Sequence, residues 1–168
     1  MSVIIQTERL ILKKIEQKDL NQLIKNLNNW NIVQWLVNVP YPYTINDAKN
    51  WIDKSIKEEL TLNIYLNNTL IGGITIDSRS EDNKNVLGYW LVEDHWGKGY
   101  VSECSKSLIS YFFSNYSEKK IIASHIIDNE KSKKILIGLG FKKINTSNVF
   151  SLSRNENVKD INYELIKS

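Results

Sequence analysis

The chain has 168 residues, of which 42% are hydrophobic and 24% charged, and its formal net charge is +3. This length fits one domain around one hydrophobic core, so we expect a single domain over residues 1–168. The lysines are interleaved with acids, which argues against a nucleic-acid partner because that class needs a clustered basic face. No stretch approaches the roughly 18 apolar residues that span a bilayer, so no membrane association is expected.

Cys104 is the single cysteine of the chain, which excludes an intrachain disulfide. A lone thiol, and no apolar run of signal-peptide length in residues 1–9, indicate a reducing, cytoplasmic setting. Cys104 falls on the apolar stripe of a predicted helix, so a core role is favoured over a nucleophilic one. With only His95 and His125 as imidazole ligands, no metal site is expected.

In chain order, alternating apolar residues predict a first strand over residues 9–15, and apolar residues at helical spacing predict a helix over residues 20–27. An aromatic segment over residues 30–43 follows. Thr44 and Asp47 then form a capping-box pattern, which predicts the start of a second helix.

A meander of strands is predicted next. Residues 62–66 and 70–76 are short apolar runs on either side of Asn67 and Asn68, a pair that favours a tight hairpin turn. A polar loop over residues 77–85 leads into a strand over residues 86–92. Because the links are short, we expect antiparallel pairing.

After Gly99 the apolar spacing becomes helical as far as Phe113. The remaining predicted elements are a strand over residues 120–127, a helix over residues 128–139, and closing strands over residues 141–148 and 161–166. Gly140 fits the position just past the end of the last helix. The order β-α-α-β-β-β-α-β-α-β-β predicts a mixed α/β domain.

A turn that contains Gly97 and Gly99 joins the strand over residues 86–92 to the long helix. Glycine lets the backbone approach a ligand closely and adopt a positive φ. The start of a helix adds unpaired N–H groups and the positive end of the helix dipole. Together these features favour a bound phosphate, although a tight turn without a ligand has the same spacing.

The pattern Gly97-x-Gly99-x-x-Ser102 is close to the dinucleotide-binding fingerprint. That fingerprint belongs to a parallel βαβ unit, whereas an antiparallel meander precedes this turn. The P-loop pattern is absent because Lys98 is followed by glycine. A dinucleotide-dependent enzyme is therefore a minor alternative.

Three segments, in consistent order, resemble the GNAT N-acetyltransferases, in the branch related to the ribosomal-protein N-terminal acetyltransferases. They are residues 7–13 (Thr-Glu-Arg-Leu-Ile-Leu-Lys), the Gly-Tyr-Trp-Leu and Trp-Gly-Lys-Gly-Tyr-Val-Ser-Glu stretches within residues 88–103, and residues 128–141, which end in Gly-Phe. The resemblance covers nearly the whole chain. It implies a single-domain fold with a central mixed, mostly antiparallel sheet flanked by about four helices.

The resemblance also implies transfer of an acetyl group from acetyl-CoA to a primary amine by direct attack. In this family the turn holds the CoA pyrophosphate, the preceding strand splays from the next one, and pantetheine binds along the exposed edge like an added strand. A free backbone N–H within residues 91–93 is expected to stabilise the oxyanion. The implied cofactor-binding residues are Leu91, Val92, Glu93, Gly97, Lys98, Gly99, Tyr100, Val101, Ser102 and Asn129.

The chain departs from the wider family at three positions. Trp96 replaces a basic or amide residue, as is common in this branch, and Val101 stands where glycine or alanine is usual and so could crowd the pyrophosphate. Leu136 occupies the position of a tyrosine acid. The branch suggests Ser132 as the catalytic substitute that supports the leaving thiolate. We assign no general base, although Glu93, Asp94, His95 and Glu103 lie near the turn in sequence.

The family places the acceptor pocket near the first two helices and the last strands. Trp35, Tyr41 and Tyr43 are candidates for its wall, with core packing as the alternative. A peptide N-terminus is the typical acceptor of the branch, and a small-molecule amine is also possible. A homodimer is expected from the family, and a non-catalytic acyl-CoA-binding module is the alternative function.

Overall fold

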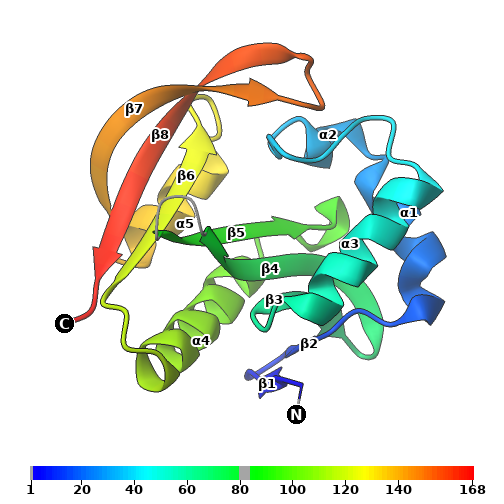
Figure 1. Cartoon of the computed structure of the whole chain (residues 1–168), viewed down its shortest axis with the longest axis horizontal. Helices are drawn as coiled ribbons and strands as arrows, with labels where there is room; N and C mark the ends of the chain where they lie inside the picture. Colours follow the sequence, from blue (N-terminus) through cyan, green and yellow to red (C-terminus); the bar gives the residue numbers. More distant parts are fainter. Residues whose placement is uncertain (1, 80–83) are drawn as a thin grey trace.

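The computed structural model describes residues 2–79 and 84–168, and its strands form one open eight-stranded sheet in the order β1-β2-β3-β4-β5-β6-β8-β7 (Figure 1). The strands are β1 (Ile5–Gln6), β2 (Ile11–Lys13), β3 (Thr61–Leu66), β4 (Thr69–Arg79), β5 (Lys84–Leu91), β6 (Lys120–Ile126), β7 (Lys142–Ser151) and β8 (Glu156–Ile166). Only β5 and β6 pair in parallel among these strands. The structure thus confirms the expected mixed, mostly antiparallel sheet.

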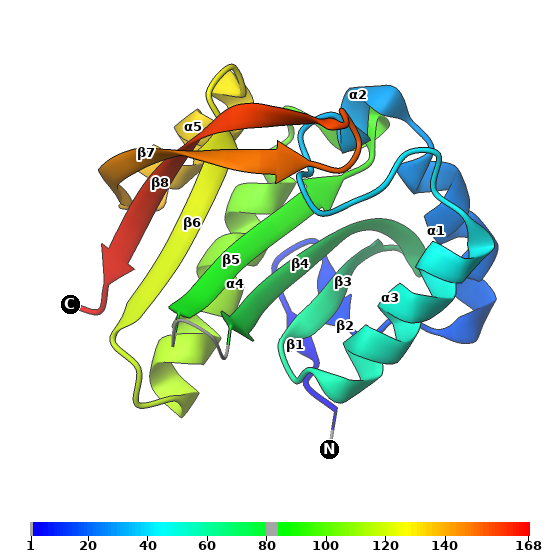
Figure 2. The same ribbon diagram turned by 45° about the horizontal axis from the view of Figure 1, so that its top comes forward.

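The helices cover both faces of the sheet (Figure 2). They are α1 (Leu20–Leu27), α2 (Trp30–Val33), α3 (Ile45–Lys57), α4 (Tyr100–Asn115) and α5 (Glu130–Gly138), with short 3-10 turns η1 (Gln17–Asp19) and η2 (Glu93–His95). Helices α1, α2 and α3 bury apolar residues such as Leu23, Val33 and Ile52 against one face. Helices α4 and α5 bury Leu108 and Leu136 against the other face, where the larger core lies. No helix in the part of the chain that the structure describes is long and apolar enough to cross a bilayer.

Local signals in the sequence predicted several element boundaries correctly. Thr44 caps α3, and its side chain and that of Asp47 bond each other's backbone in a capping box. Asn67 and Asn68 both adopt positive φ, 47° and 65°, in the hairpin turn between β3 and β4. The meander β3-β4-β5 is antiparallel throughout, as expected.

Other boundaries differ from the predictions. The first strand is shorter than residues 9–15 and pairs with β1, which the sequence did not reveal because it has only two residues. The predicted loop over residues 77–85 is wrong at both ends, since Asp77 pairs with Val86 and Arg79 with Lys84; residues 80–83 lie outside the described part of the chain. The last two strands are longer than expected because their exposed polar residues hide the alternation.

Candidate active site

Strands β5 and β6 run side by side over only two residue pairs, Val86 with Ile122 and Leu87 with Ala123. Beyond these pairs the two strands diverge, as Figure 1 shows, while β5 stays paired with β4 as far as Leu91. The edge of β5 that faces β6 is therefore left without a neighbouring strand at its carboxyl end. This is the splay that the resemblance described above implied.

The backbone of Leu91 faces this splay. The Val92 N–H donates to the Ile71 carbonyl at 2.8 Å, so Val92 faces β4. Because successive residues of a strand point their N–H and C=O groups to opposite edges, Leu91 faces the other way. Its carbonyl accepts a hydrogen bond from the Trp96 indole at 2.8 Å. Of residues 91–93, in which a free N–H was expected, Val92 is thus excluded, and the N–H of Leu91 faces the splay.

The turn before α4 has the backbone shape that the two glycines predicted. Gly97 and Gly99 adopt φ values of +75° and +77°, and Gly99 is the N-cap of α4. A side chain at Gly97 would meet no atom within 4 Å, so this side of the turn is open. The first turn of α4 presents unpaired backbone N–H groups beside that open side, from Tyr100, Val101 and Ser102. Such an arrangement suits a phosphate group.

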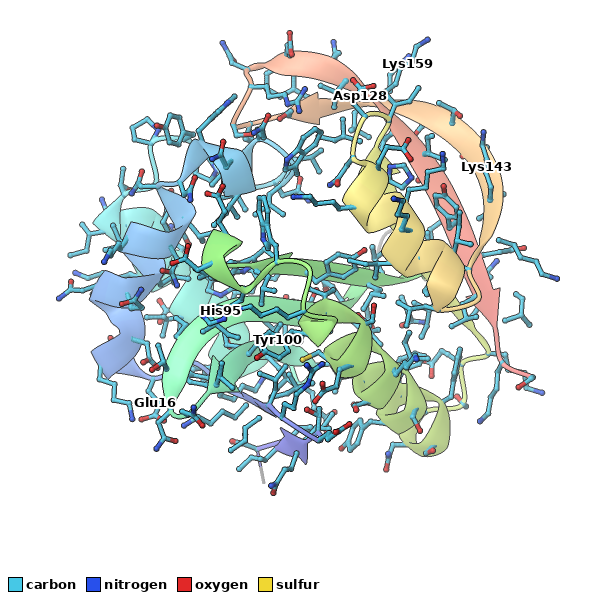
Figure 3. The ribbon with its side chains drawn as sticks, turned by 180° about the vertical axis from the view of Figure 1, so that it is seen from behind. Glu16, His95, Tyr100, Asp128, Lys143 and Lys159 are labelled. Carbon is cyan, nitrogen blue, oxygen red and sulfur yellow. The ribbon has the colours of Figure 1, made fainter. Side chains whose placement is uncertain are left out.

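Figure 3 shows the turn and α5 from behind the view of Figure 1. His95 and Tyr100 mark the segment that leads into α4, and Asp128 marks the place where β6 turns into α5. Lys131 of α5 lies over the Trp96 ring, with its Nζ 4.1 Å from the ring centroid. Helix α5 and the glycine turn thus approach each other beside the splay.

Val101 does not crowd the turn. Its side chain is buried, 8% exposed, in the larger core beneath α4. The branched side chain therefore points away from the open side of the turn. The concern raised by a β-branched residue at this position does not apply to the geometry observed.

Asn129 and Ser132 stand at the start of α5, which begins at Glu130 rather than at residue 128. Asn129 is the N-cap, and its Oδ1 accepts from the Ser132 N–H at 3.1 Å. The Ser132 side chain is buried, and its Oγ lies 2.8 Å from the hydroxyl of Tyr89 on β5. The two candidate residues are thus held together, and a third polar group joins them.

Tyr89 is a residue that the sequence analysis missed. It belongs to the Gly-Tyr-Trp-Leu stretch, but its partner Ser132 lies 43 residues later, so only the folded structure brings the two hydroxyls together. Burial raises the pKa of Tyr89 to about 12, although its hydrogen bond with Ser132 acts in the opposite direction. The phenol therefore keeps its proton near neutral pH and can donate it in a hydrogen bond to Ser132.

The position where relatives carry a tyrosine acid is apolar here. Leu136 is fully buried in the larger core. Cys104 is also fully buried, and burial raises the pKa of its thiol to about 12. A protonated, inaccessible thiol confirms the core role predicted for this residue.

Two of the candidate bases near the turn, Glu93 and Glu103, already have hydrogen-bond partners, whereas the buried Nδ1 of His95 has none among the described residues. Glu93 accepts from the side-chain amides of Asn29, at 2.9 Å, and Asn31, at 3.1 Å, which lower the pKa of its carboxyl group. Glu103 is engaged by the N-terminal segment of the chain. His125 is buried, with its Nε2 3.0 Å from the Tyr163 hydroxyl. The contacts of Glu93, Glu103 and His125 do not single out any of these three groups as a base.

The three aromatic residues proposed for the acceptor pocket have different environments. Tyr43 is buried in the smaller core, and its backbone is bonded on both sides by Asn28. Burial also raises the pKa of its hydroxyl. Tyr43 therefore serves core packing, the alternative left open by the sequence. Tyr41 is 43% exposed with its ring centroid 5.2 Å from that of Trp30, and Trp35 lies under the guanidinium of Arg154 at 5.1 Å.

The segment with Trp35 contacts the turn between β7 and β8 (Figure 2). Arg154 Nε donates to the Gln34 carbonyl at 2.8 Å, and the Ser153 hydroxyl donates to the Val33 carbonyl at 2.9 Å. The Leu152 N–H donates to the Val37 carbonyl at 2.8 Å. The first helices and the last strands thus meet on the side where the splay opens, as the resemblance implied.

Comparison with known proteins is consistent with this geometry. Residues 9–142 match the family described as acetyltransferase (GNAT) domain. An uncharacterized N-acetyltransferase, YoaA of Bacillus subtilis, is 28% identical over 153 residues, which are 85% of each chain. The ribosomal-protein-serine acetyltransferase of Escherichia coli is 29% identical over 79 residues, 46% of this chain and 44% of that protein. The crystal structure of a GNAT-family acetyltransferase from Bacillus anthracis matches with a TM-score of 0.84 at 20% identity and covers 98% of both chains.

Proposed function

Because this chain belongs to the GNAT family of acetyl-CoA-dependent N-acetyltransferases, we propose that it acetylates a primary amine, either a protein N-terminus or a small-molecule amine, by direct attack on acetyl-CoA. One observation carries the proposal: the splay between β5 and β6 opens between the glycine turn and the Tyr89–Ser132 pair. The anion site, the free strand edge and the hydroxyl pair suit the diphosphate, the pantetheine and the leaving sulfur of an acyl-CoA, respectively.

Each part of acetyl-CoA has a complementary group in this site. The backbone N–H groups from Gly97 to Ser102 would hold the pyrophosphate. The free edge of β5 at Leu91 would pair with pantetheine, and the Leu91 N–H would stabilise the oxyanion that forms on the thioester carbonyl. Asn129 would contact the cofactor from the start of α5.

The amine nitrogen attacks the thioester carbonyl carbon and forms the C–N bond, and the C–S bond then breaks. The amine gives up its proton to solvent, and the departing sulfur takes up a proton to become the thiol of CoA. Ser132 supports the thiolate as it forms, while Tyr89 donates to the Ser132 oxygen and leaves the Ser132 hydrogen free to point at the sulfur. These assignments place two hydroxyls, from β5 and α5, at the leaving group.

For the acceptor, Tyr41 and Trp35 would form the wall of the pocket, together with the β7–β8 turn that contacts Trp35. The relative from Escherichia coli is named as a ribosomal-protein acetyltransferase, which favours a peptide N-terminus as the acceptor. A single free cysteine fits a reducing compartment, so we propose that the reaction takes place in the cytoplasm.

Calorimetric titration with acetyl-CoA, with NAD as the control ligand, tests this proposal first. We expect micromolar binding of acetyl-CoA and none of NAD, followed by turnover with one member of a panel of peptide N-termini, polyamines and amino sugars. Binding without turnover across the panel would favour a non-catalytic acyl-CoA-binding module. Absence of binding would contradict the proposed site.

Val101→Ala tests whether the turn is already open to the pyrophosphate. Because the Val101 side chain is buried in the core, its truncation should cost about 2 kcal/mol of unfolding free energy, from lost burial and the cavity left behind. The affinity for acetyl-CoA should not improve. Urea unfolding and calorimetry measure the two quantities, and a tighter complex in the variant would show that Val101 crowds the ligand after all.

A further inference from the structure

The N-terminal segment of the chain reaches the first turn of α4 and binds its acidic residue. Both oxygens of Glu103 are occupied: Oε1 accepts from the Thr7 hydroxyl at 2.5 Å and from the Arg9 N–H at 2.8 Å, and Oε2 accepts from Arg9 Nε at 2.7 Å. The Glu103 side chain is mostly buried. These contacts hold the Arg9 side chain against Glu103, a residue that lies more than 90 positions later in the chain.

The guanidinium of Arg9 also contacts the glycine turn itself. Its Nη1 donates to the Lys98 carbonyl at 3.0 Å, and its central carbon lies 4.5 Å from the centroid of the Tyr100 ring. A Cβ atom added to Gly99 would lie 3.6 Å from Nη2. One planar group thus touches three consecutive residues of the turn, whereas a Cβ atom added to Gly97 would meet no atom within 4 Å.

This contact determines the direction of one backbone N–H group. In a trans peptide the carbonyl oxygen and the following N–H point in opposite directions. Because the Lys98 carbonyl points to Arg9, the Gly99 N–H points away from Arg9, where it is available to a bound phosphate. Without the guanidinium, the Lys98–Gly99 peptide would lose this hydrogen bond, and Gly99, which has no Cβ, would do little to restrict its rotation.

The ion pair between Arg9 and Glu103 also neutralises a negative charge close to the turn. A carboxylate in the first turn of α4 would repel a pyrophosphate bound there. Burial alone would raise the pKa of Glu103, but the hydrogen bonds from Thr7 and Arg9 outweigh it, so the pKa of this carboxyl is lowered and the group is ionised at neutral pH. Arg9 supplies the opposite charge, and its hydrogen bond to Glu103 raises the pKa of its guanidinium.

We propose that Arg9, held by Glu103, is a positioning residue that orients the Gly99 amide toward the diphosphate of acetyl-CoA. The proposal rests on the proposed function of the same site. Lysine cannot take this role, because a single ammonium lacks the planar fork that contacts the Glu103 carboxylate and the Lys98 carbonyl at once.

Arg9→Lys tests the proposal, since it keeps the charge and removes the fork. Its kcat and KM are measured with two acetyl donors, acetyl-CoA and S-acetylpantetheine, which lacks the diphosphate and the nucleotide. With acetyl-CoA we expect KM to rise about tenfold with kcat unchanged, the size of one lost charged hydrogen bond. With S-acetylpantetheine, kcat/KM should stay within about twofold of the wild type.

A merely structural role for Arg9 would lower kcat/KM with both donors by the same factor, and that result would overturn the proposal, as would an unchanged KM for acetyl-CoA. Circular dichroism establishes that each variant is folded before it is assayed. Glu103→Gln weakens the Arg9–Glu103 contact by changing its acidic partner. This variant should also raise KM for acetyl-CoA and leave kcat/KM for S-acetylpantetheine unchanged. Lys18→Gln, which breaks an exposed ion pair with Glu16, is the control and should leave kcat and KM unchanged with both donors. Failure of the wild type to bind acetyl-CoA would instead refute the proposed function itself.

Discussion

Ser132→Ala should lower kcat by roughly 10- to 100-fold and leave the affinity for acetyl-CoA unchanged. A hydrogen bond to a charged group contributes about 1.5–3 kcal/mol, and each 1.36 kcal/mol corresponds to a factor of ten in rate. The thiolate carries its charge only as the C–S bond breaks, so the loss belongs to kcat rather than to binding. Steady-state kinetics with a saturating acceptor and calorimetry with acetyl-CoA measure the two quantities separately.

Two further variants sharpen this test. Tyr89→Phe removes the partner of Ser132 but keeps the serine, so kcat should fall less, by about 3- to 10-fold. Ser110→Ala removes an exposed serine on α4, outside the site, and should be neutral. If Ser132→Ala kept full turnover with unchanged affinity, Ser132 would have no role at the leaving group. A loss confined to acetyl-CoA affinity would make it a binding residue only.

Local features of the site were predictable because they depend on neighbouring residues. Gly97 and Gly99 predicted the positive φ values of the turn. Asn129 predicted a helix N-cap, and its side chain accepts a hydrogen bond from the Ser132 N–H. The parallel pairing of β5 with β6 could not be predicted from neighbouring residues, because α4 lies between these two strands in the chain. The resemblance to a known family supplied the splay, which composition and spacing alone do not predict.

Contacts between distant segments were not predictable in the same way. Tyr89 on β5 contacts Ser132 only when β6 and α5 lie beside β5, and Arg9 contacts Lys98 only when strands β2 to β5 lie side by side. Tyr43 shows a second difficulty. The sequence does not distinguish an aromatic residue in a pocket wall from one in a core, and Tyr43 lies in the smaller core. The single turn of α2 lies in the aromatic segment and is too short to produce a helical period.

The position of the Leu91 N–H depends on how closely β4 and β5 approach each other. Gly72 pairs with Leu91, and a Cβ added to Gly72 would lie 2.5 Å from the Trp90 carbonyl oxygen and 3.1 Å from a methyl carbon of Leu91. The carbonyl belongs to the backbone of a paired strand, so it cannot rotate away as a side chain would. Gly72→Ala must therefore push β5 away from β4 at the residue that faces the splay.

We expect Gly72→Ala to cost about 1–3 kcal/mol of unfolding free energy, the range typical of overpacking, and to lower kcat at least about tenfold at a temperature where it stays folded. Gly88→Ala is the matched control in the same sheet, because its added Cβ would meet only the Thr75 hydroxyl oxygen, at 3.4 Å. Urea unfolding and steady-state kinetics of both variants measure the effects. A folded Gly72→Ala protein with wild-type kcat would contradict the role of the Leu91 amide, because the oxyanion would then tolerate a displaced donor. A loss of kcat in Gly72→Ala without one in Gly88→Ala would tie catalysis to the spacing of β4 and β5 at Leu91.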